Sequence, residues 1–450
     1  MQYLSVYILN TARILAHMYR DSLKTLQEWR LSPQRKPLLI RGARQVGKSW
    51  LVDEFGKYFD SYVKINFEKE RAIHQVFASD LIVEQIIDEL SLYAGKKIQP
   101  DKTLLFFDEI QECDNAIKSL RYFKEDYPEL HVIAAGSLID FKFEELGMPV
   151  GRVQYLHLNP LSFAEFLVAC GRDDLRVHLL RQQVNDALQA ALLNLLKTYL
   201  WVGGMPAAVE SWLTYKDASQ CHAIQDEITQ TYYDDFAKYA KKNQVPLVEK
   251  VFKSVPAQLG RKFKFSHVDK EVRSLYLKNS LDLLEKAGIV HICYHTNAQQ
   301  IPLGAEADDK KFKVFFFDVG LAQRILGLDM KEWVLTPIKV DNIGAIAEQF
   351  VAQELTAYSP SNKKSQLYYW HRENKTSNAE VDFILEHQGH IVPIEVKSSA
   401  KGQLKSLHQY LDTHPQAPYG VRISEICFSE NDLIRDVPLY GIESFLKDEG

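Results

Sequence analysis

Residues 38–160 alternate short, almost uninterrupted apolar runs with segments whose apolar residues recur at helical spacing. An apolar run without polar alternation is typical of a strand that is buried on both faces of a parallel sheet. Strands that alternate with helices predict a doubly wound α/β sheet, in which ligands bind beyond the carboxyl ends of the strands. The expected strands are residues 38–40, 61–67, 103–107, 131–135 and 153–158.

The middle of the chain has a helical pattern. Residues 161–245 are rich in Leu, Ala, Gln and Tyr at helical spacing, which predicts a lid and connecting bundle. Residues 246–318 predict helices followed by a β-hairpin, and this succession describes a winged helix. The two hairpin strands are expected at residues 289–294 and 313–317, joined by a long polar loop.

A second hairpin is predicted from two apolar segments, 380–385 and 391–397, that flank Gln388-Gly389. A turn at this dipeptide fixes which residues face each other across the hairpin. Because side chains alternate along a strand, polar residues should share one face, and Val381 and Phe383 should pack on the other. The opposed polar pairs are Asp382 with Glu395 and Glu380 with Lys397.

A glycine-rich segment lies between the first predicted strand and a predicted helix. Residues 42–49, GARQVGKS, match the P-loop pattern G-x-x-x-x-G-K-[ST]. In this context backbone N–H groups surround a polyphosphate and the helix dipole adds positive potential, while Lys48 reaches the β- and γ-phosphates and Ser49 binds Mg²⁺. The sequence therefore predicts an ATP site. Its expected contacts are Gly42, Ala43, Arg44, Gln45, Val46, Gly47, Lys48, Ser49 and Trp50.

Two acids end the third predicted strand. Asp108 would support Mg²⁺, and Glu109 would orient and deprotonate the attacking water, which indicates ATP hydrolysis rather than binding alone. Ser137, at the tip of the fourth strand, would either sense the γ-phosphate or cap a helix, and the sequence leaves both roles open.

The acids of the C-terminal hairpin predict a different chemistry. Opposed carboxylates repel, so Asp382 and Glu395 fit best around a divalent cation, Mg²⁺ or Mn²⁺. Lys397 could then stabilise a pentavalent phosphate or position a hydroxide. Two alternatives stay open: a polar sheet face with a Glu380–Lys397 ion pair, and a nuclease-like fold that binds without cutting.

The chain resembles the AAA+ ATPases, and most of all a bacterial and archaeal group that carries a restriction-endonuclease-like C-terminal region. The resemblance implies that Arg152 is an arginine finger or sensor arginine, acting in trans if the protein oligomerises; a surface arginine is the alternative. The matching segments are GARQVGKS at 42–49, FFDEIQ at 106–111, GSLI at 136–139, GRV and NPLSFAEFL within 151–167, and GGMPAAV at 203–209.

The C-terminal part resembles the PD-(D/E)XK nucleases, in which Asp382, Glu395 and Lys397 would form the D…E-x-K core. Glu348, on a helix expected at residues 344–355, matches a helix carboxylate found in Holliday-junction resolvases. The expected domains are a possible N-terminal extension at 1–17, an AAA+ P-loop ATPase core at 18–170, a helical lid or connector at 171–245, a winged helix at 246–330 and an α/β nuclease-like domain at 331–450.

Composition limits the partners. The 450 residues carry a net charge of −5, so any surface for DNA must be local. Residues 248–286 carry 9 Lys and Arg against 5 Asp and Glu, which suits either DNA phosphates or a solvated helix face. Five scattered cysteines predict reduced thiols, and the absence of a long apolar stretch predicts a cytoplasmic protein without membrane contact.

The sequence as a whole predicts an ATP-hydrolysing protein that couples turnover to DNA binding or to metal-dependent phosphodiester cleavage. Two alternatives use the same residues differently. One is a nucleotide-gated switch that binds nucleic acid or a protein partner and cuts nothing, and the other is a DNA-binding regulator with a nuclease-like scaffold.

Overall fold

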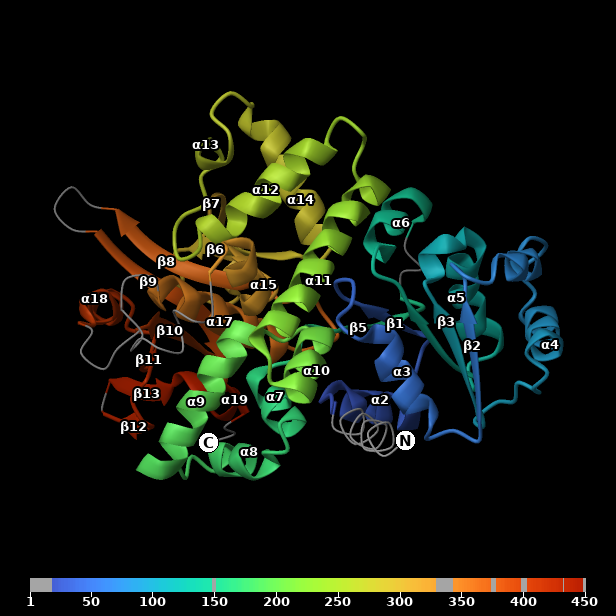
Figure 1. The fold of residues 1–450 in the computed structure, drawn as a ribbon, viewed down its shortest axis with the longest axis horizontal. Coiled ribbons are helices and arrows are strands. Elements are labelled where there is room, and N and C mark those ends of the chain that lie inside the picture. The colour runs from blue at the N-terminus through green and yellow to red at the C-terminus, as the bar shows by residue number, and fades with distance from the viewer. Residues whose placement is uncertain are drawn as a thin grey trace.

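The computed structural model describes residues 18–147, 151–328, 343–373, 378–397, 403–431 and 433–447. The predicted extension at 1–17 lies outside these ranges. Figure 1 shows two α/β parts at opposite sides of the molecule, with a group of long helices between them. None of the helices in the described residues has both the length and the apolar character that crossing a membrane requires.

The N-terminal part contains a five-stranded sheet in the order β2-β3-β4-β1-β5. All four strand pairs are parallel, as the apolar runs predict. Its strands are β1 (Leu38–Arg41), β2 (Ser61–Asn66), β3 (Thr103–Asp108), β4 (His131–Ala135) and β5 (Gln154–His157).

Helices cover both faces of this sheet, because alternate strand residues belong to two separate cores. Leu38, Leu104 and Ile133 pack toward α2 and α3, whereas Leu39, Leu105 and Val132 pack toward the helices of the other face. The helices of the first face are α2 (Ser22–Leu31) and α3 (Lys48–Gly56), and those of the second are the 3₁₀ helix η1 (Arg71–Phe77), α4 (Val83–Ala94), the 3₁₀ helix η2 (Ile110–Glu112), α5 (Asp114–Asp126) and α6 (Ile139–Leu146).

The middle part is helical, as expected from its spacing of apolar residues. Pro246 lies in the first turn of α12, the position that proline tolerates best. The helices are α7 (Phe163–Ala169), α8 (Asp173–Leu180), α9 (Asp186–Val202), α10 (Pro206–Tyr215), α11 (Ala218–Tyr239), α12 (Val245–Ala257), α13 (Phe265–Val268), α14 (Ser274–Lys286) and α15 (Val319–Ile325).

The C-terminal part contains an eight-stranded mixed sheet in the order β12-β13-β11-β10-β9-β8-β6-β7. Helix α17 (Ile343–Ala357) packs on β7 and β10, and α18 (Lys405–Thr413) packs on β9 and β10. The remaining elements are β6 (Val290–Thr296), the 3₁₀ helix η3 (Leu303–Glu306), β7 (Ala307–Phe316), β8 (Leu367–Glu373), β9 (Asn378–His387), β10 (His390–Val396), β11 (Gly420–Ser424), β12 (Ser429–Glu430), β13 (Ile434–Pro438), the 3₁₀ helix η4 (Leu439–Gly441) and α19 (Ile442–Lys447).

The hairpin β6–β7 belongs to this C-terminal sheet, because β6 pairs in parallel with β8. The boundary expected at residue 330 therefore runs between strands of one sheet. Strand β7 also begins earlier than the predicted 313–317. Its first half carries exposed polar residues because β7 lies at the edge of the sheet, and such residues were assigned to a polar loop.

The GGMP segment at 203–206 joins the three parts by close backbone contact. Gly204 accepts a hydrogen bond from the N–H of Leu161 at 2.7 Å and donates its own N–H to Asp318 Oδ2 at 2.6 Å. A Cβ atom on Gly203 would lie 2.3 Å from Asp318 Oδ1, and one on Gly204 would lie 2.2 Å from the Leu161 carbonyl oxygen. Only glycine fits at either position.

One continuous hydrophobic core runs from the α2–α3 face of the first sheet through the middle helices to the C-terminal sheet. A buried carboxyl group makes a hydrogen bond between the C-terminal part and the middle helices. Glu354 of α17 is 2% exposed, and its Oε1 accepts the N–H of Phe163, the first residue of α7, at 3.0 Å. Burial raises the pKa of Glu354 to about 8 from its ordinary 4.5.

We expect Glu354→Gln to reduce the pH dependence of stability. Between pH 4.5 and 8 the folded state binds the Glu354 proton that the unfolded state releases, so wild-type stability falls as pH rises across this window. Glutamine has no such proton. Melting temperatures at pH 5.5 and pH 8 should differ less in the variant, whereas Glu89→Gln on the exposed face of α4 should behave as wild type. An unchanged slope in Glu354→Gln would show that this carboxyl is ionised in the folded protein.

Candidate functional site: a phosphate loop and a buried charge cluster

The segment between β1 and α3 has the backbone of a phosphate-binding loop. Gly42, Gln45 and Gly47 have φ values of 146°, 64° and 95°. A Cβ atom on Gly42 would lie 2.2 Å from the carbonyl oxygen of Leu158, so the glycine is required by both its φ and its surroundings. Gly47 directly precedes α3, so the loop ends at a helix N-terminus.

Lys48 lies across the loop that it follows. Its Nζ donates to the carbonyl oxygens of Gly42 at 2.9 Å and Ala43 at 2.8 Å. Burial lowers the pKa of Lys48 to about 8. The ammonium therefore donates to neutral carbonyl oxygens, and the charged oxygens of a phosphate would be stronger acceptors in their place.

Ser49 and Asp108 are brought together across the end of the sheet. The Ser49 hydroxyl donates to Asp108 Oδ1 at 2.8 Å, and Asn66 of β2 donates to Asp108 Oδ2 at 3.2 Å. A hydroxyl and a carboxylate at this separation supply the oxygen ligands that Mg²⁺ prefers, so these residues fit the ion expected from the sequence.

Glu109 has a left-handed backbone with φ 50° and ψ 46°. Gln111 donates from Nε2 to Glu109 Oε2 at 2.7 Å, while its Oε1 is buried and unpaired among the described residues. A Cβ atom on Gly136 would lie 2.2 Å from that oxygen. Gln111 therefore fixes the carboxylate of Glu109 against the end of β4, immediately before Ser137.

Arg152 lies two residues before β5 and beside the last turn of α5, at the end of the strands opposite to the phosphate loop. Its Nε donates to Glu125 Oε1 at 2.8 Å, and its side chain is 45% exposed. Arg152 therefore cannot reach the loop of its own chain, and a role toward a second copy stays a prediction. Trp50 packs, half-buried, against the core in the first turn of α3.

The loop is covered by the middle part of the chain. Arg44 Nη1 contacts both carboxylate oxygens of Asp235, on α11, at 2.9 Å. The hydroxyl of Tyr232 donates to the Arg44 carbonyl at 2.6 Å. On the other side Gly288, with φ +72°, packs so closely that a Cβ atom would lie 3.3 Å from the Ala43 nitrogen.

The C-terminal hairpin has the predicted register. Ile394 pairs with Phe383 and His390 with His387, and Gln388 and Gly389 both have positive φ, as a two-residue turn requires. The expectation that Val381 and Phe383 share one apolar face is wrong. They belong to separate cores because the β8–β9 pairing shifts register near this point.

A buried lysine lies among the predicted acids. Lys313 of β7 is 1% exposed, and its Nζ lies 2.6 Å from Glu380, 3.2 Å from Glu348 and 3.5 Å from Asp382. Burial acts to lower the pKa of Lys313, but these three carboxylates raise it well above its ordinary value. Lys313 is therefore a cation at the centre of the cluster.

Glu395 pairs with Lys397 at 2.5 Å, so Lys397 does not form the alternative ion pair with Glu380. Asp382 Oδ2 accepts the N–H of Val396 at 2.8 Å. Burial, and next the negative charge of Asp382, raise the pKa of Glu395 to about 8 and that of Glu348 to about 7.

The described residues contain no group of three or more His, Cys, Asp or Glu side chains arranged to hold a metal ion. The metal-binding roles of Glu348, Asp382 and Glu395 thus stay predictions. The buried Glu395 Oε2 has no hydrogen-bond partner among the described residues, so this oxygen is available to a cation, whereas Lys313 contacts the other carboxylates.

Sequence reasoning missed three residues of these sites: Gln111, Asp235 and Lys313. Lys313 lies in the strand assigned to a winged-helix hairpin, far in sequence from the acids that it contacts. A lysine in an otherwise apolar run, KVFFF, is the one local signal that could have marked it.

Comparisons with known proteins agree with the geometry of the loop. Residues 34–167 match the family described as AAA domain. Residues 193–332 and 343–441 match two domains of unknown function, DUF8612 and DUF4143. No curated protein matches the chain. With its parallel sheet and phosphate loop, the N-terminal part is a P-loop nucleotide-binding domain of the AAA class.

Two solved structures are also similar to the chain. The ORC1 protein of Aeropyrum pernix in complex with DNA is 12% identical, covers 71% of this chain and 94% of its own, and has a TM-score of 0.28. Drosophila ORC bound to DNA is 13% identical, covers 68% and 85%, and has a TM-score of 0.26. A likeness at this level carries no argument about function.

We expect Gly288→Ala to weaken ATP binding more than its backbone strain alone explains. The added Cβ would press on the Ala43 nitrogen of the phosphate loop. Gly327→Ala is a matched control, because Gly327 has φ +71° and open space around the added atom. Both variants should lose about 1 kcal/mol of stability. Only Gly288→Ala should raise the Kd for a fluorescent ATP analogue, and equal Kd values would refute the contact's role.

Proposed function

We propose that this protein binds and hydrolyses ATP with Mg²⁺ and uses the nucleotide state of its AAA domain to control its C-terminal domain. The observation that carries the proposal is the 2.8 Å hydrogen bond between Ser49 and Asp108 beside the buried Lys48. This bond joins the phosphate loop to the end of β3, where Asp108 and Glu109 lie, and hydrolysis requires these groups close together.

Each residue has a separate task. Lys48 binds the β- and γ-phosphates, and Ser49 and Asp108 hold Mg²⁺, which neutralises charge on the phosphate oxygens. Glu109 accepts the proton of the attacking water, and Gln111 orients that carboxylate through its 2.7 Å hydrogen bond. Ser137 senses the γ-phosphate from the end of β4.

The contacts around the loop supply a route to the rest of the chain. Arg44 is paired with Asp235 on α11, and Ala43 packs on Gly288, two residues before β6. Since β6 and β7 are strands of the C-terminal sheet, a shift of the loop on nucleotide binding would reach Lys313 through one hairpin. Coupling of this kind requires two arrangements of the same packed elements.

We expect Lys48→Ala to abolish ATP binding, and Glu109→Gln to keep binding but slow hydrolysis by about 100-fold or more, because only the proton acceptor is lost. Isothermal titration with ATP and phosphate release under single turnover separate the two effects. Lys57→Ala, which removes an exposed ion pair with Glu54, is the control and should match wild type in both assays. Full turnover in Glu109→Gln would refute its assigned role.

A second candidate function is metal-dependent cleavage of DNA by the C-terminal domain. The convergence of Glu348, Glu380 and Asp382 on the buried Lys313 favours it, since clustered ionisable groups with perturbed pKa values are typical of functional sites. With Glu395 and Lys397 the cluster has four acids and two lysines, so loss of the protons that the raised pKa values of Glu348 and Glu395 favour would leave two negative charges for one divalent cation.

Lys313 sets the condition for that activity. Its ammonium contacts the carboxylate oxygens that a metal would need, so binding of a metal and binding of Lys313 compete. With Lys313 in place, we infer a domain that binds nucleic acid or another partner without cutting. Cutting would require the hairpin β6–β7 to move, which the coupling proposed above could provide.

We expect Lys313→Ala to lose about 3 kcal/mol of stability, because three clustered carboxylates, of which Asp382 is buried, lose their cation. Mg²⁺ or Mn²⁺ should restore part of the loss, and the metal should raise the melting temperature of the variant more than that of wild type. Lys311→Ala, on the same strand but exposed, should show neither effect. If no divalent ion raises the melting temperature of Lys313→Ala, the cluster is not a cation site.

Cleavage is tested directly on branched, single-stranded and duplex DNA with Mg²⁺ or Mn²⁺, with and without ATP. Cutting by wild type that is lost in Asp382→Asn would establish the second function, and its loss in Lys48→Ala would place it under nucleotide control. ATP hydrolysis without cutting of any substrate would leave the switch as the function.

A further inference from the structure

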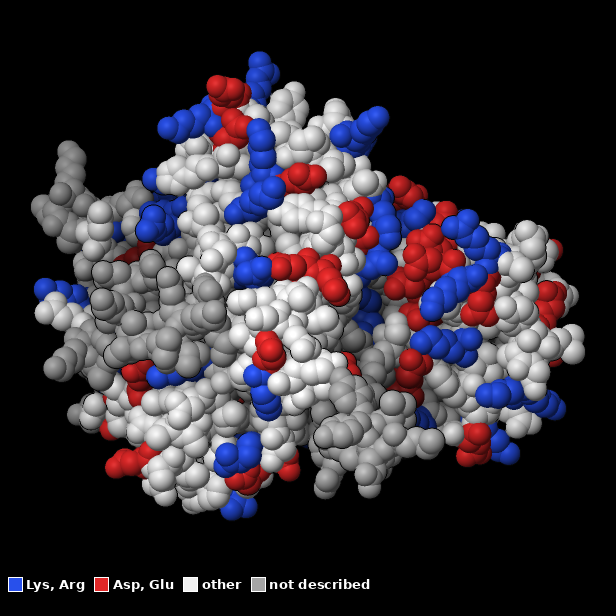
Figure 2. Space-filling model, viewed as in Figure 1, with Lys and Arg blue, Asp and Glu red and all other residues white. Residues whose placement is uncertain are grey.

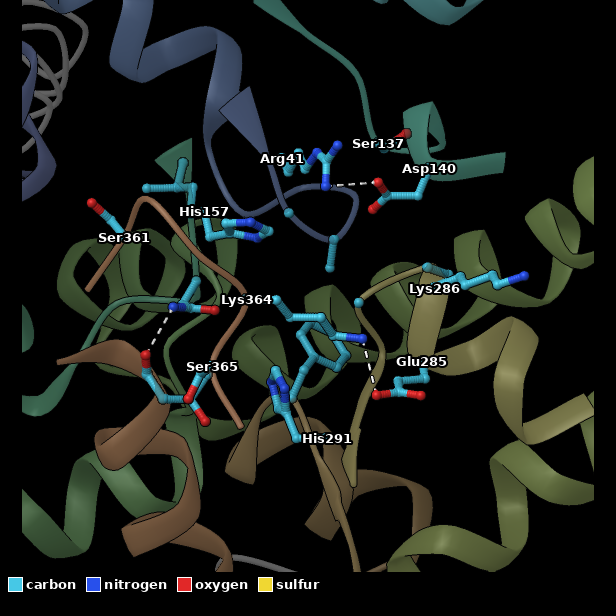
Figure 3. Close-up of a pocket in the computed structure, with 18 of the residues that line it drawn as sticks. Arg41, Ser137, Asp140, His157, Glu285, Lys286, His291, Ser361, Lys364 and Ser365 are labelled. Atoms are coloured by element: carbon cyan, nitrogen blue, oxygen red, sulfur yellow. Dashed lines mark hydrogen bonds and ion pairs between the residues drawn. The ribbon is translucent and has the colours of Figure 1, made fainter. Parts of the chain in front are cut away.

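A cavity lies where the AAA domain, the α14–β6 turn and the α17–β8 loop meet (Figure 3). Its AAA wall comes from the ends of β1, β4 and β5 and includes Arg41, Ser137 and His157. On either side of the α14–β6 turn, the end of α14 contributes Lys286 and β6 contributes His291. Three segments that are far apart in sequence thus face one space, and each brings at least one basic side chain.

Positive charge exceeds negative charge around this cavity. The lining cations are Arg41, Lys286, Lys363 and Lys364, and the lining acids are Asp140 and Glu285. Three of the cations already have acid partners. Arg41 lies 3.1 Å from Asp140, Lys364 lies 2.9 Å from Glu285, and Lys286 pairs with Glu144 outside the lining.

Arg41 is held rigidly. Its guanidinium carbon lies 4.1 Å from the ring centre of Tyr155 and 5.1 Å from that of Phe143, and its Nε and Nη2 have no hydrogen-bond acceptor among the described residues. A planar cation fixed between two rings, with donors to spare, is preorganised for an oxyanion.

Neutral donors complete the lining. Burial, and next the charge of Arg41, lower the pKa of His157 to about 4, and burial and Lys364 do the same for His291. Both imidazoles are therefore uncharged at neutral pH and donate one N–H each. Serine hydroxyls at positions 137, 359, 361 and 365 also line the cavity.

The cavity reaches the phosphate loop. Gly42 and Ala43, the first two residues of the P-loop, form part of its wall together with Gly288. An anion in this space would contact the nucleotide domain and the C-terminal domain at once.

We propose that this interdomain cavity binds a phosphoryl group. Four cations against three acids, with Glu144 counted, leave one net positive charge beside the cavity, the sign that a phosphoryl oxyanion requires. Guanidinium, ammonium, imidazole and hydroxyl donors match its oxygens. The group has two possible sources: the terminal phosphate of the ATP held by the P-loop, or a separate phosphate-bearing ligand. The first source rests on the function proposed above, and the second does not.

The test uses the full-length protein at low ionic strength and has two arms. In the first, inorganic phosphate is titrated into Lys48→Ala, which cannot hold the phosphates of a nucleotide, with and without Lys364→Ala. In the second, ATPγS and ADP are titrated into protein with Lys48 intact, again with and without Lys364→Ala. We expect Lys364→Ala to raise the Kd of the ligand that uses the cavity by about tenfold.

The outcomes separate the sources. If phosphate binds to Lys48→Ala and binds more weakly when Lys364→Ala is added, the cavity takes a separate phosphate-bearing ligand. Weaker binding of ATPγS with unchanged binding of ADP shows the terminal phosphate of the nucleotide. If Lys364→Ala changes neither arm, the proposal is overturned. Failure of wild type to bind any nucleotide would overturn the proposed function but leave the first arm valid.

The variant Glu285→Gln tests whether weaker anion binding in Lys364→Ala comes from lost charge or from a disturbed fold. It removes one acid from the lining and the partner of Lys364. The added positive charge should therefore tighten binding of the same anion severalfold, whereas a damaged fold would weaken it. Lys57→Ala, an exposed lysine away from the cavity lining, should leave both titrations unchanged. Weaker binding in Glu285→Gln would refute the electrostatic basis of the proposal.

Discussion

The carboxylate of Asp318 is the constraint on which the arrangement of the parts depends. It is fully buried between β7 and α15, where it accepts N–H groups from Leu321 at 2.9 Å and Gly204 at 2.6 Å. Burial raises its pKa to about 6. A Cβ atom on Gly320 would lie 2.6 Å from the Gly203 nitrogen, so the two chain segments meet backbone to backbone. No flexible side chain lies between the two backbones, so neither segment can move without the other. The C-terminal sheet and the middle helices therefore pack as one body.

That rigid junction gives the nucleotide loop a fixed frame. The loop itself is bounded by Arg44–Asp235 on one side and by Gly288 on the other. The face in Figure 2 carries acidic and basic side chains interspersed rather than one large field of a single sign. Charged side chains also gather at two places inside the fold, the Lys313 cluster and the cavity beside the loop. Ion pairs there are worth more than exposed pairs, because water screens them less.

The sequence was most informative where structure is local. The P-loop, the five parallel strands and the turn at Gln388-Gly389 each follow from a few neighbouring residues, and all three are present. Prediction failed where distant segments meet. The hairpin β6–β7 looked like a separate wing because its pairing with β8 crosses dozens of residues, and the bulge near Asp382 leaves no mark in a pattern of alternation. Lys313 and Asp235 were missed for the same reason: their partners are chosen by tertiary packing.

The Lys313 cluster also restricts how the chain can evolve. Loss of the lysine alone leaves three clustered carboxylates without their cation, and loss of the carboxylates alone leaves a buried ammonium unpaired. Either change removes a large share of a typical folding free energy, although a concerted replacement by apolar residues would be nearly neutral. The acids and their lysine should therefore be inherited or discarded together, as one heritable unit drawn from two regions of the gene.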